Sequence, residues 1–272
     1  MNILFNHLSH LSWLRIKGVI LRSYYEMTHS FGRVVDSFFW PVLDLLIWGL
    51  TFVYLESNTT DVSFSSVIIG SLILWTLIYT IQRDLTISFI QDVWDQNLYN
   101  IFASPLLPTE LMIGGTIVAF VKSAFIAVIM GIGAYTLYGF NILDIFPLIA
   151  WAIVIITLFG IVFGILSAAF IYRMGRNVEI LCWSALAIVM PLVCVYYPVS
   201  ALPSFLQPVA WSLPPTYLFE AIRNFLQSGT IPSVMYWAKA SGVSLLYLVA
   251  ALLFFNYSYR HAKRRGWFVK MD

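Results

Sequence analysis

The stretch FPLIAWAIVIITLFGIVFGILSAAFIY, Phe146–Tyr172, carries no charged residue. A transmembrane helix needs about 20 mostly apolar residues, so this stretch is long enough to span a bilayer. A transmembrane strand would alternate apolar and polar residues, and the run Ile149–Ile156 does not. The sequence therefore predicts a membrane-spanning helix here, and we expect an all-α membrane protein.

Composition supports that class for the whole chain. Its 272 residues are 60% hydrophobic and 10% charged, whereas soluble domains are about 45–50% apolar and about 25% charged. A net charge of +2 gives no strong basic field, so nucleic acid is not an expected partner. Six stretches are apolar enough to predict a polytopic protein with six transmembrane helices: Val34–Leu55, Phe64–Gln82, Met112–Tyr138, Phe146–Tyr172, Val178–Tyr197 and Ala240–Tyr259.

The distribution of basic residues predicts the orientation. Cytoplasmic segments of membrane proteins are enriched in Lys and Arg. With the N-terminus inside, the outer segments hold only Arg223 and Lys239. We therefore expect a multi-pass protein of the inner (cytoplasmic) membrane, with both termini cytoplasmic and insertion through the first span. The inner segments hold the remaining basic residues outside the spans: Arg15, Lys17, Arg22, Arg33, Arg83, Arg173, Arg176, Arg260, Lys263, Arg264, Arg265 and Lys270.

One transmembrane domain covering residues 1–272 accommodates all of these segments. Leu4, Leu8, Leu11 and Leu14 recur at helical spacing within Leu4–Tyr25, which favours an amphipathic helix at the inner interface. A soluble helix packed on a partner is the alternative. The expected order is an interfacial helix in 1–33, five spans in 34–197, a re-entrant outer segment in 198–239, the sixth span in 240–259 and a cytoplasmic tail in 260–272.

The inner connection Arg83–Leu111 is longer than a turn between antiparallel helices requires, which is about 2–8 residues. A short helix within Asn97–Ser104 would stop before Pro105. Its apolar residues are too few to span a membrane, so they would form an exposed apolar patch unless a soluble subunit covered them. We expect a cytoplasmic docking element here; a helix that simply protrudes from the membrane is the alternative.

The outer segment Pro198–Lys239 is apolar but interrupted by prolines, so it cannot form one straight spanning helix. Irregular backbone at membrane depth must be buried in protein or face a water-filled cavity. The pattern predicts a re-entrant pair of short helices, Ser204–Leu213 and Tyr217–Gln227, with an ordinary outer loop as the alternative. Glu220 and Arg223, at i,i+3 spacing, can pair within the second helix.

Charged residues fall within the first and third predicted spans. Asp36 and Asp44 lie in the first span and Lys122 lies in the third. Asp44 and Lys122 would each lie about 15 Å deep, near mid-bilayer. Charges there are costly, so we expect a buried ion pair between Asp44 and Lys122, or a site that contacts substrate or protons. Gly160 and Gly164 open a stripe of small residues that favours close helix approach, within one protomer or between protomers.

Catalytic motifs are missing from the sequence. No glycine-rich loop precedes Lys122-Ser123 to cradle a phosphate, and no zinc-ligand spacing or nucleophile triad is present. We therefore expect no enzymatic activity, cofactor or metal in this chain. A membrane-embedded transferase would need a histidine or acidic constellation at the membrane surface, and none is evident.

Three stretches carry a resemblance to a known family: Phe39–Gly49, Leu98–Glu110, and Tyr197–Pro203 followed by Leu213–Arg223. With the six-span layout, the chain resembles the permease subunits of ATP-binding-cassette (ABC) exporters of the second permease class, the type that exports drugs, lipo-oligosaccharides or polysaccharides. The resemblance implies a dimer, with a second permease copy or with a homologue, and two separate ATPase subunits that hold ATP and Mg. The first stretch looks like the first span, the second like the coupling helix, and the third like the segment before the last span.

The resemblance also assigns roles to residues. It implies ATPase-coupling contacts at Asn97, Leu98, Tyr99, Ile101 and Phe102, and a second set at Arg173, Arg176 and Glu179. It implies an outer gate that contains Pro198, Pro203, Pro214, Pro215, Glu220 and Arg223. The expected partners are membrane lipids and an amphipathic substrate that is drug-like, a lipid, or a lipid-linked oligosaccharide or polysaccharide. The competing class is an ion-coupled carrier or channel without an ATPase, for which Asp44 and Lys122 are the candidate ligands.

Overall fold

The computed structural model describes residues 11–57, 64–95 and 97–265. Every regular element in these ranges is a helix, which confirms the all-α prediction. The long helices are α3 (Phe31–Ser57), α4 (Phe64–Trp94), α6 (Pro108–Tyr138), α7 (Phe146–Met174) and α11 (Val234–Arg265). The shorter elements are α2 (Trp13–Thr28), α5 (Leu98–Ala103), η1 (Ile142–Ile145), η2 (Gly175–Val178), α8 (Glu179–Val193), η3 (Val199–Ala201), α9 (Gln207–Ser212) and α10 (Pro214–Ser228).

Five helices in the described ranges are long and apolar enough to cross a membrane: Phe31–Glu56, Ser66–Trp94, Pro108–Tyr138, Ile142–Met174 and Val234–Arg264. The predicted span Val178–Tyr197 instead forms the 15-residue helix α8. At a rise of 1.5 Å per residue, α8 is about 22 Å long, shorter than the hydrocarbon core of about 30 Å. Cys194 ends α8 with a left-handed φ of 60°. The prediction of six full-length spanning helices is therefore not confirmed.

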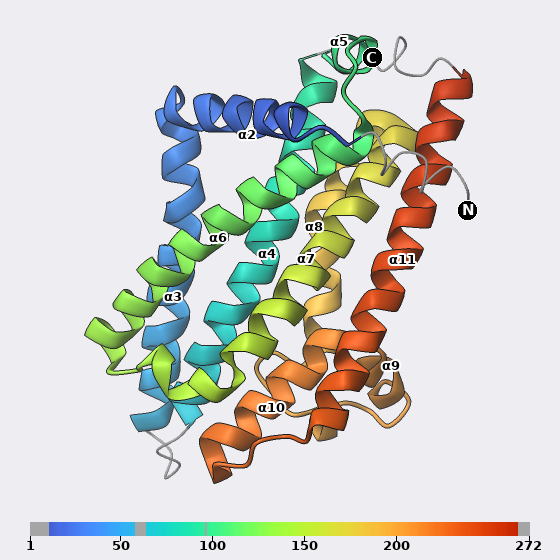
Figure 1. The fold of residues 1–272 in the computed structure, drawn as a ribbon. Helices are drawn as coiled ribbons and strands as arrows, with labels where there is room; N and C mark the ends of the chain where they lie inside the picture. Colours follow the sequence, from blue (N-terminus) through green and yellow to red (C-terminus); the bar gives the residue numbers. More distant parts are fainter. Residues whose placement is uncertain (1–10, 58–63, 96, 266–272) are drawn as a thin grey trace.

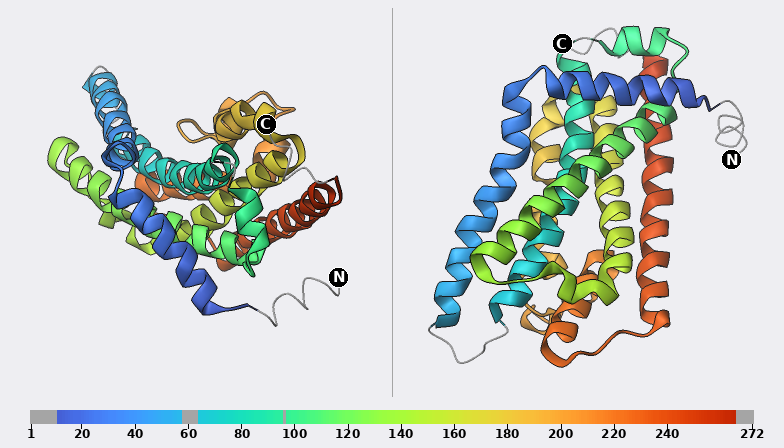
Figure 2. Two further views of the ribbon diagram at one scale, coloured as in Figure 1. Left: turned by 90° about the horizontal axis from the view of Figure 1, so that it is seen from above. Right: turned by 60° about the vertical axis from the view of Figure 1, so that its left-hand side comes forward.

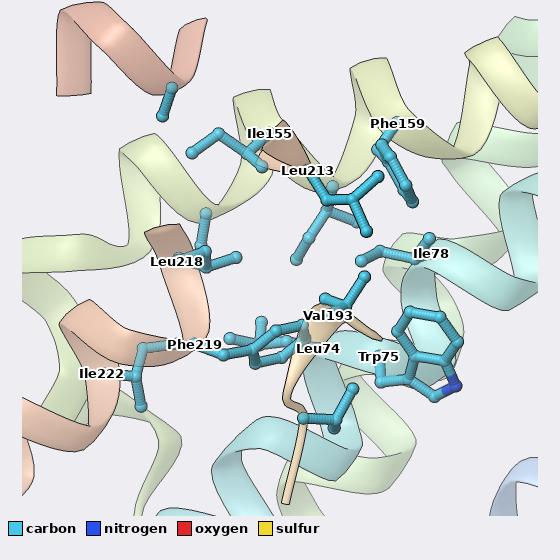
Figure 3. Close-up of a cluster of buried hydrophobic side chains, with 14 of the residues drawn as sticks. Leu74, Trp75, Ile78, Ile155, Phe159, Val193, Leu213, Leu218, Phe219 and Ile222 are labelled. Atoms are coloured by element: carbon cyan, nitrogen blue, oxygen red, sulfur yellow. The ribbon is translucent and has the colours of Figure 1, made fainter. Parts of the chain in front are cut away.

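The long helices run side by side, and α4 lies at the centre of the bundle (Figure 1). In α4, 83% of the membrane-length window is buried, whereas the windows of α3 and α11 are each 22% buried. Leu74, Trp75 and Ile78 of α4 belong to one buried cluster with residues of α7 and α10, shown in Figure 3. The core of the protein therefore centres on α4, and α3 and α11 form its flanks.

Small residues allow α7 to approach α4 closely. A Cβ added at Gly160 would lie 2.8 Å from the Cβ of Ile81, and one added at Gly164 would lie 2.6 Å from a methyl carbon of Leu85. Both distances are shorter than real Cβ contacts, so a larger residue at either position would force α4 or its side chains to shift. The stripe that begins at Gly160 therefore packs within the protomer.

Helix α2 lies across one end of the bundle, roughly perpendicular to the long helices (Figures 1 and 2). Ile16 and Val19 are buried, whereas Leu14 is 78% exposed. A Cβ added at Gly114 of α6 would lie 2.7 Å from Val19, so α2 packs directly on α6. Helix α2 thus overlaps the predicted stretch Leu4–Tyr25 and continues beyond it to Thr28, whereas Leu4 and Leu8 lie outside the described residues.

The predicted re-entrant segment folds against the opposite end of the bundle (Figure 1). The first expected helix, Ser204–Leu213, is shorter in the structure, as α9, and the second, Tyr217–Gln227, lies within α10. Phe219, Ala221 and Ile222 of α10 are fully buried. An ordinary exposed loop does not bury such side chains, so this segment is part of the protein core.

Candidate functional site

Helix α5 connects the ends of α4 and α6 at the end of the bundle that carries α2 (Figure 1). The amide of Asn97 donates to the carbonyl of Asp92 at 3.0 Å, which joins α5 to the end of α4. Ser104 then turns to an extended conformation before Pro105, so the helix ends where the sequence predicted. Ile101 is buried in a cluster beneath α5. The side chains of Leu98, Tyr99 and Phe102 lie outside the described part, so their contacts stay predictions.

A buried carboxylate at the start of α6 holds the N-terminal end of α2. Glu110 is fully buried, and its Oε1 accepts hydrogen bonds from the amide of Ser12 at 2.7 Å and from Nε of Arg15 at 2.9 Å. Nη2 of Arg15 lies 2.8 Å from the same oxygen. The other oxygen accepts from the amide of Leu107 at 2.9 Å, which caps α6. Glu110 thus joins the N-terminus of α6 to α2.

A second ion pair holds the middle of α2 to the end of α4. Arg22 donates to Oδ1 of Asp92, whose side chain is fully buried. Arg22 also donates to Glu26 at 2.7 Å. Burial lowers the pKa of Arg22, but the hydrogen bond and charge of Asp92 and the nearby Glu26 outweigh that effect and raise it. Because α4 and α6 flank α5, these two ion pairs connect α2 to both ends of the α5 segment.

Sequence reasoning missed both of these ion pairs. Arg15 and Glu110 are 95 residues apart, and Arg22 and Asp92 are 70 apart, so no local spacing signals them. A weak signal existed: Arg15 and Arg22 are seven residues apart on one helix face, and acidic residues precede and follow the predicted docking element.

The second predicted coupling segment, Arg173–Glu179, lies at the same end of the bundle as α2 and α5 (Figure 1). It forms the end of α7, the short helix η2 and the start of α8. Gly175 has a positive φ of 66°, which allows the sharp turn between α7 and α8. The guanidinium of Arg173 lies 5.3 Å from the ring centroid of Tyr257, whereas the side chain of Arg176 is outside the described part.

The predicted ion pair between Asp44 and Lys122 is wrong. Nζ of Lys122 instead donates to Oδ1 of Asp84 at 2.8 Å. Helix α4 continues to Trp94, well past its predicted end at Gln82, and this extension places Asp84 inside the bundle opposite Lys122. Asp36 accepts from the indole of Trp40 at 2.9 Å and lies 3.9 Å from Arg83.

At the opposite end, the predicted pair of Glu220 and Arg223 is confirmed, with Nη1 of Arg223 2.8 Å from Oε1 of Glu220. Nη2 of Arg223 donates to the carbonyls of Cys194 and Tyr197 at 3.1 and 3.0 Å. Oε1 of Glu220 accepts from the amide of Val199 at 2.7 Å. The pair therefore anchors the irregular backbone after α8 to α10.

The prolines assigned to the outer gate mark the turns of this segment. Pro198 precedes η3, and Pro203 follows it. Pro214 and Pro215 begin α10, where a proline costs no intrahelical hydrogen bond, and both are buried. In the described ranges no group of three or more His, Cys, Asp or Glu residues could hold a metal ion.

A comparison with known protein families gives a match over most of the chain. The profile described as ABC-2 type transporter matches residues 25–226, from the end of α2 to α10. The chain belongs to the ABC-2 type transporter family. It is therefore a multi-pass ABC transporter permease rather than an ATPase, and ABC-2 permeases associate with ATP-binding subunits. A comparison of this chain with curated proteins found no match.

Proposed function

We propose that two copies of this permease form the pathway by which an amphipathic substrate leaves the cytoplasm. ATP hydrolysis on separate ATPase subunits, which hold the ATP and Mg, would power the transport. The observation that carries the proposal is the connection of α2, through Glu110 and Asp92, to both helices that flank α5. A subunit that moves α5 would move the ends of α4, α6 and α2 together.

The ATPase-docking surface would consist of α5 and the segment Arg173–Glu179, which lie at the same end of the bundle. The apolar residues Leu98, Tyr99 and Phe102 of α5 suit a groove on a soluble subunit, whereas Ile101 is buried in the cluster beneath α5 and does not face a partner. Aromatic residues often dominate the energy of such contacts. We therefore assign docking to α5, with η2 as the second contact.

Movement at this end would reach the outer segment through α4. This helix contributes Leu74 and Trp75 to the buried cluster that contains Leu218 and Phe219 of α10 (Figure 3). Closely packed cores transmit displacements because they contain few voids that could absorb them. Helix α10, anchored by Glu220 and Arg223, would then act as the outer gate, and the low charge of the long helices suits an amphipathic substrate.

The distribution of charge supports a cytoplasmic location for the α2 end. Arg15, Lys17, Arg22 and Arg33 lie on or beside α2, and α11 ends on the same side of the bundle with Arg260, Lys263 and Arg264 (Figure 1). By the positive-inside rule, this side faces the cytoplasm and both ends of the chain are cytoplasmic, in the inner membrane.

The dimer is proposed from the apolar surface of α3. In this helix, 22% of the membrane-length window is buried, and its exposed large hydrophobic residues include Phe39, Trp40, Ile47, Trp48, Leu50 and Tyr54. Lipid can cover such a surface, and so can a second copy of the chain. A transport pathway between two copies requires that a second copy covers this surface of α3, so we propose a homodimer.

Co-purification of the tagged permease with a co-expressed ABC ATPase subunit tests the proposal. We expect the complex to hydrolyse ATP in a substrate-stimulated manner and the permease alone to hydrolyse none. Transport by the permease in proteoliposomes that contain an ion gradient but no ATPase would instead establish an ion-coupled carrier.

A further inference from the structure

An open cavity of about 410 Å³ is lined by residues of α2, α3, α4 and α6. This volume is within the range of about 300–1,000 Å³ that is typical of ligand sites. Three cations and three carboxylates line it: Arg33, Arg83, Lys122, Glu26, Asp36 and Asp84. The formal charge of the cavity lining is therefore balanced.

The guanidinium of Arg83 lacks the partners that its burial requires. Arg83 is 5% exposed, and its Nε has no hydrogen-bond partner. Its ionic contact within the described ranges is Oδ2 of Asp36, 3.9 Å from Nη1, which is too long for a hydrogen bond. A guanidinium offers five N–H donors, and leaving a buried charged group without hydrogen bonds is costly. An acceptor that is not part of the described residues, either water or a bound ligand in the cavity, can supply the missing contacts of Arg83.

The neighbouring Asp84 has the complementary deficiency. Its Oδ1 accepts from Lys122, but its Oδ2 is buried without a partner. Two adjacent residues of α4 thus present one unmatched donor group and one unmatched acceptor. An anion alone would satisfy Arg83 and lie close to two carboxylates, Asp36 and Asp84. A ligand that carries both an anion and an N–H donor would satisfy Arg83 and Asp84 together.

We infer that this cavity binds the zwitterionic headgroup of a lipid, with a phosphate that accepts from Arg83 and a primary ammonium that donates to Asp84. The mouth of the cavity supports a lipid as the source. Asp36 there is half-exposed, and the exposed apolar side chains of Phe31, Val35 and Phe39 flank it on α3. Acyl chains can lie along these residues while the headgroup enters beneath α2.

This inference goes beyond the proposed export function and does not depend on it. Binding is measured on the permease without an ATPase or a transported substrate. Failure of the headgroup site would therefore leave the export proposal standing, and failure of ATPase co-purification would leave the headgroup site standing.

The test is native mass spectrometry of the delipidated full-length chain, titrated with phosphatidylethanolamine, phosphatidylglycerol or phosphatidylcholine of identical acyl chains. Phosphatidylglycerol lacks the ammonium, and the quaternary ammonium of phosphatidylcholine has no N–H donor. We expect phosphatidylethanolamine to bind about 10-fold more tightly than either, because hydrogen bonds to charged groups are worth about 1.5–3 kcal/mol. Equal binding of all three lipids would overturn the inference and indicate that water alone fills the cavity. Soluble phosphoethanolamine that binds as tightly as the lipid would overturn the assignment of a lipid.

Two variants place the binding in this cavity. Arg83→Gln removes the phosphate partner, and Ser88→Phe fills the cavity while leaving all six charged residues in place. Each variant should weaken phosphatidylethanolamine binding about 10-fold or more, to the level of the other lipids. The control Lys239→Gln removes an exposed cation of α11 outside the cavity lining and should bind as the unaltered chain does. Unchanged binding by Ser88→Phe, with a monodisperse elution profile, would show that the lipid binds elsewhere.

Discussion

Replacing Glu110 by Gln should loosen α2 from the bundle while leaving the spans intact. The side chain keeps its shape but loses the charge that pairs with Arg15. The carboxylate accepts hydrogen bonds at both oxygens, from Ser12 and Arg15 at one and from Leu107 at the other. An amide in either orientation would place its NH₂ group against one of these donors, so at least one contact becomes repulsive.

The expected loss of stability follows from the burial of the Glu110–Arg15 ion pair. Glu110 is fully buried and Arg15 is 29% exposed at its side chain, so the pair is largely sheltered from water. Removing one partner of a buried ion pair costs about 3–5 kcal/mol in the limiting case. The partial exposure of Arg15 reduces that cost, so we expect a loss of about 2–3 kcal/mol in the free energy of unfolding measured in detergent micelles.

A double-mutant cycle of Glu110→Gln with Arg15→Gln tests the reasoning. The double variant should lose clearly less free energy of unfolding than the sum of the losses in the two single variants. Once either residue of the ion pair is replaced, replacing the other removes no further ion pair. Lys17→Gln is the control on the same helix, since Lys17 is exposed and has no ion pair within the described residues. Additive losses, or a loss for Lys17→Gln as large as that for Glu110→Gln, would refute the assignment of Glu110 as the group that holds α2.

Three further changes test other parts of the structure. Truncating Phe102 to Ala should weaken ATPase binding by about 1–3 kcal/mol, measured by co-purification, while the permease still inserts. Lys122→Met and Asp84→Asn should show non-additive losses of stability in a thermal-unfolding cycle, because the two side chains pair at 2.8 Å. Gly164→Ala should cost about 1–3 kcal/mol through overpacking against α4, whereas Gly242→Ala, with open space around its Cβ, should leave stability almost unchanged.

The structure could be predicted from the sequence wherever it depends on residues that are close together in the chain. Apolar length predicted the five long helices that the described ranges contain. The end of α5 follows from Pro105, because a proline disfavours helical conformation in the residue before it. The i,i+3 spacing of Glu220 and Arg223 predicted their ion pair. Each of these features depends on residues that are close in the chain.

Features that depend on distant residues were missed or misplaced. The second span was predicted to end at Gln82 because polar residues follow it, but helix α4 continues to Trp94. Its polar residues are tolerated there because Arg22 pairs with Asp92 and Lys122 pairs with Asp84. These partners come from other helices, so hydropathy along one segment could not indicate them. The short α8 was missed for a related reason, since its apolar sequence continues while its backbone turns at Cys194.

The position of α4 connects these observations. Its inner half contains Arg83, Asp84 and Asp92, which contact α3, α6 and α2 respectively through ion pairs. Its outer half contributes apolar side chains to the cluster that surrounds α10 (Figure 3). A displacement of α5 therefore acts on a helix that is closely packed along its length and is also held by ion pairs to α2, α3 and α6 at its inner end. Because ion pairs can exchange partners more readily than a close-packed core can rearrange, we expect conformational change to begin beneath α2 and to reach α10 as a rigid movement of α4.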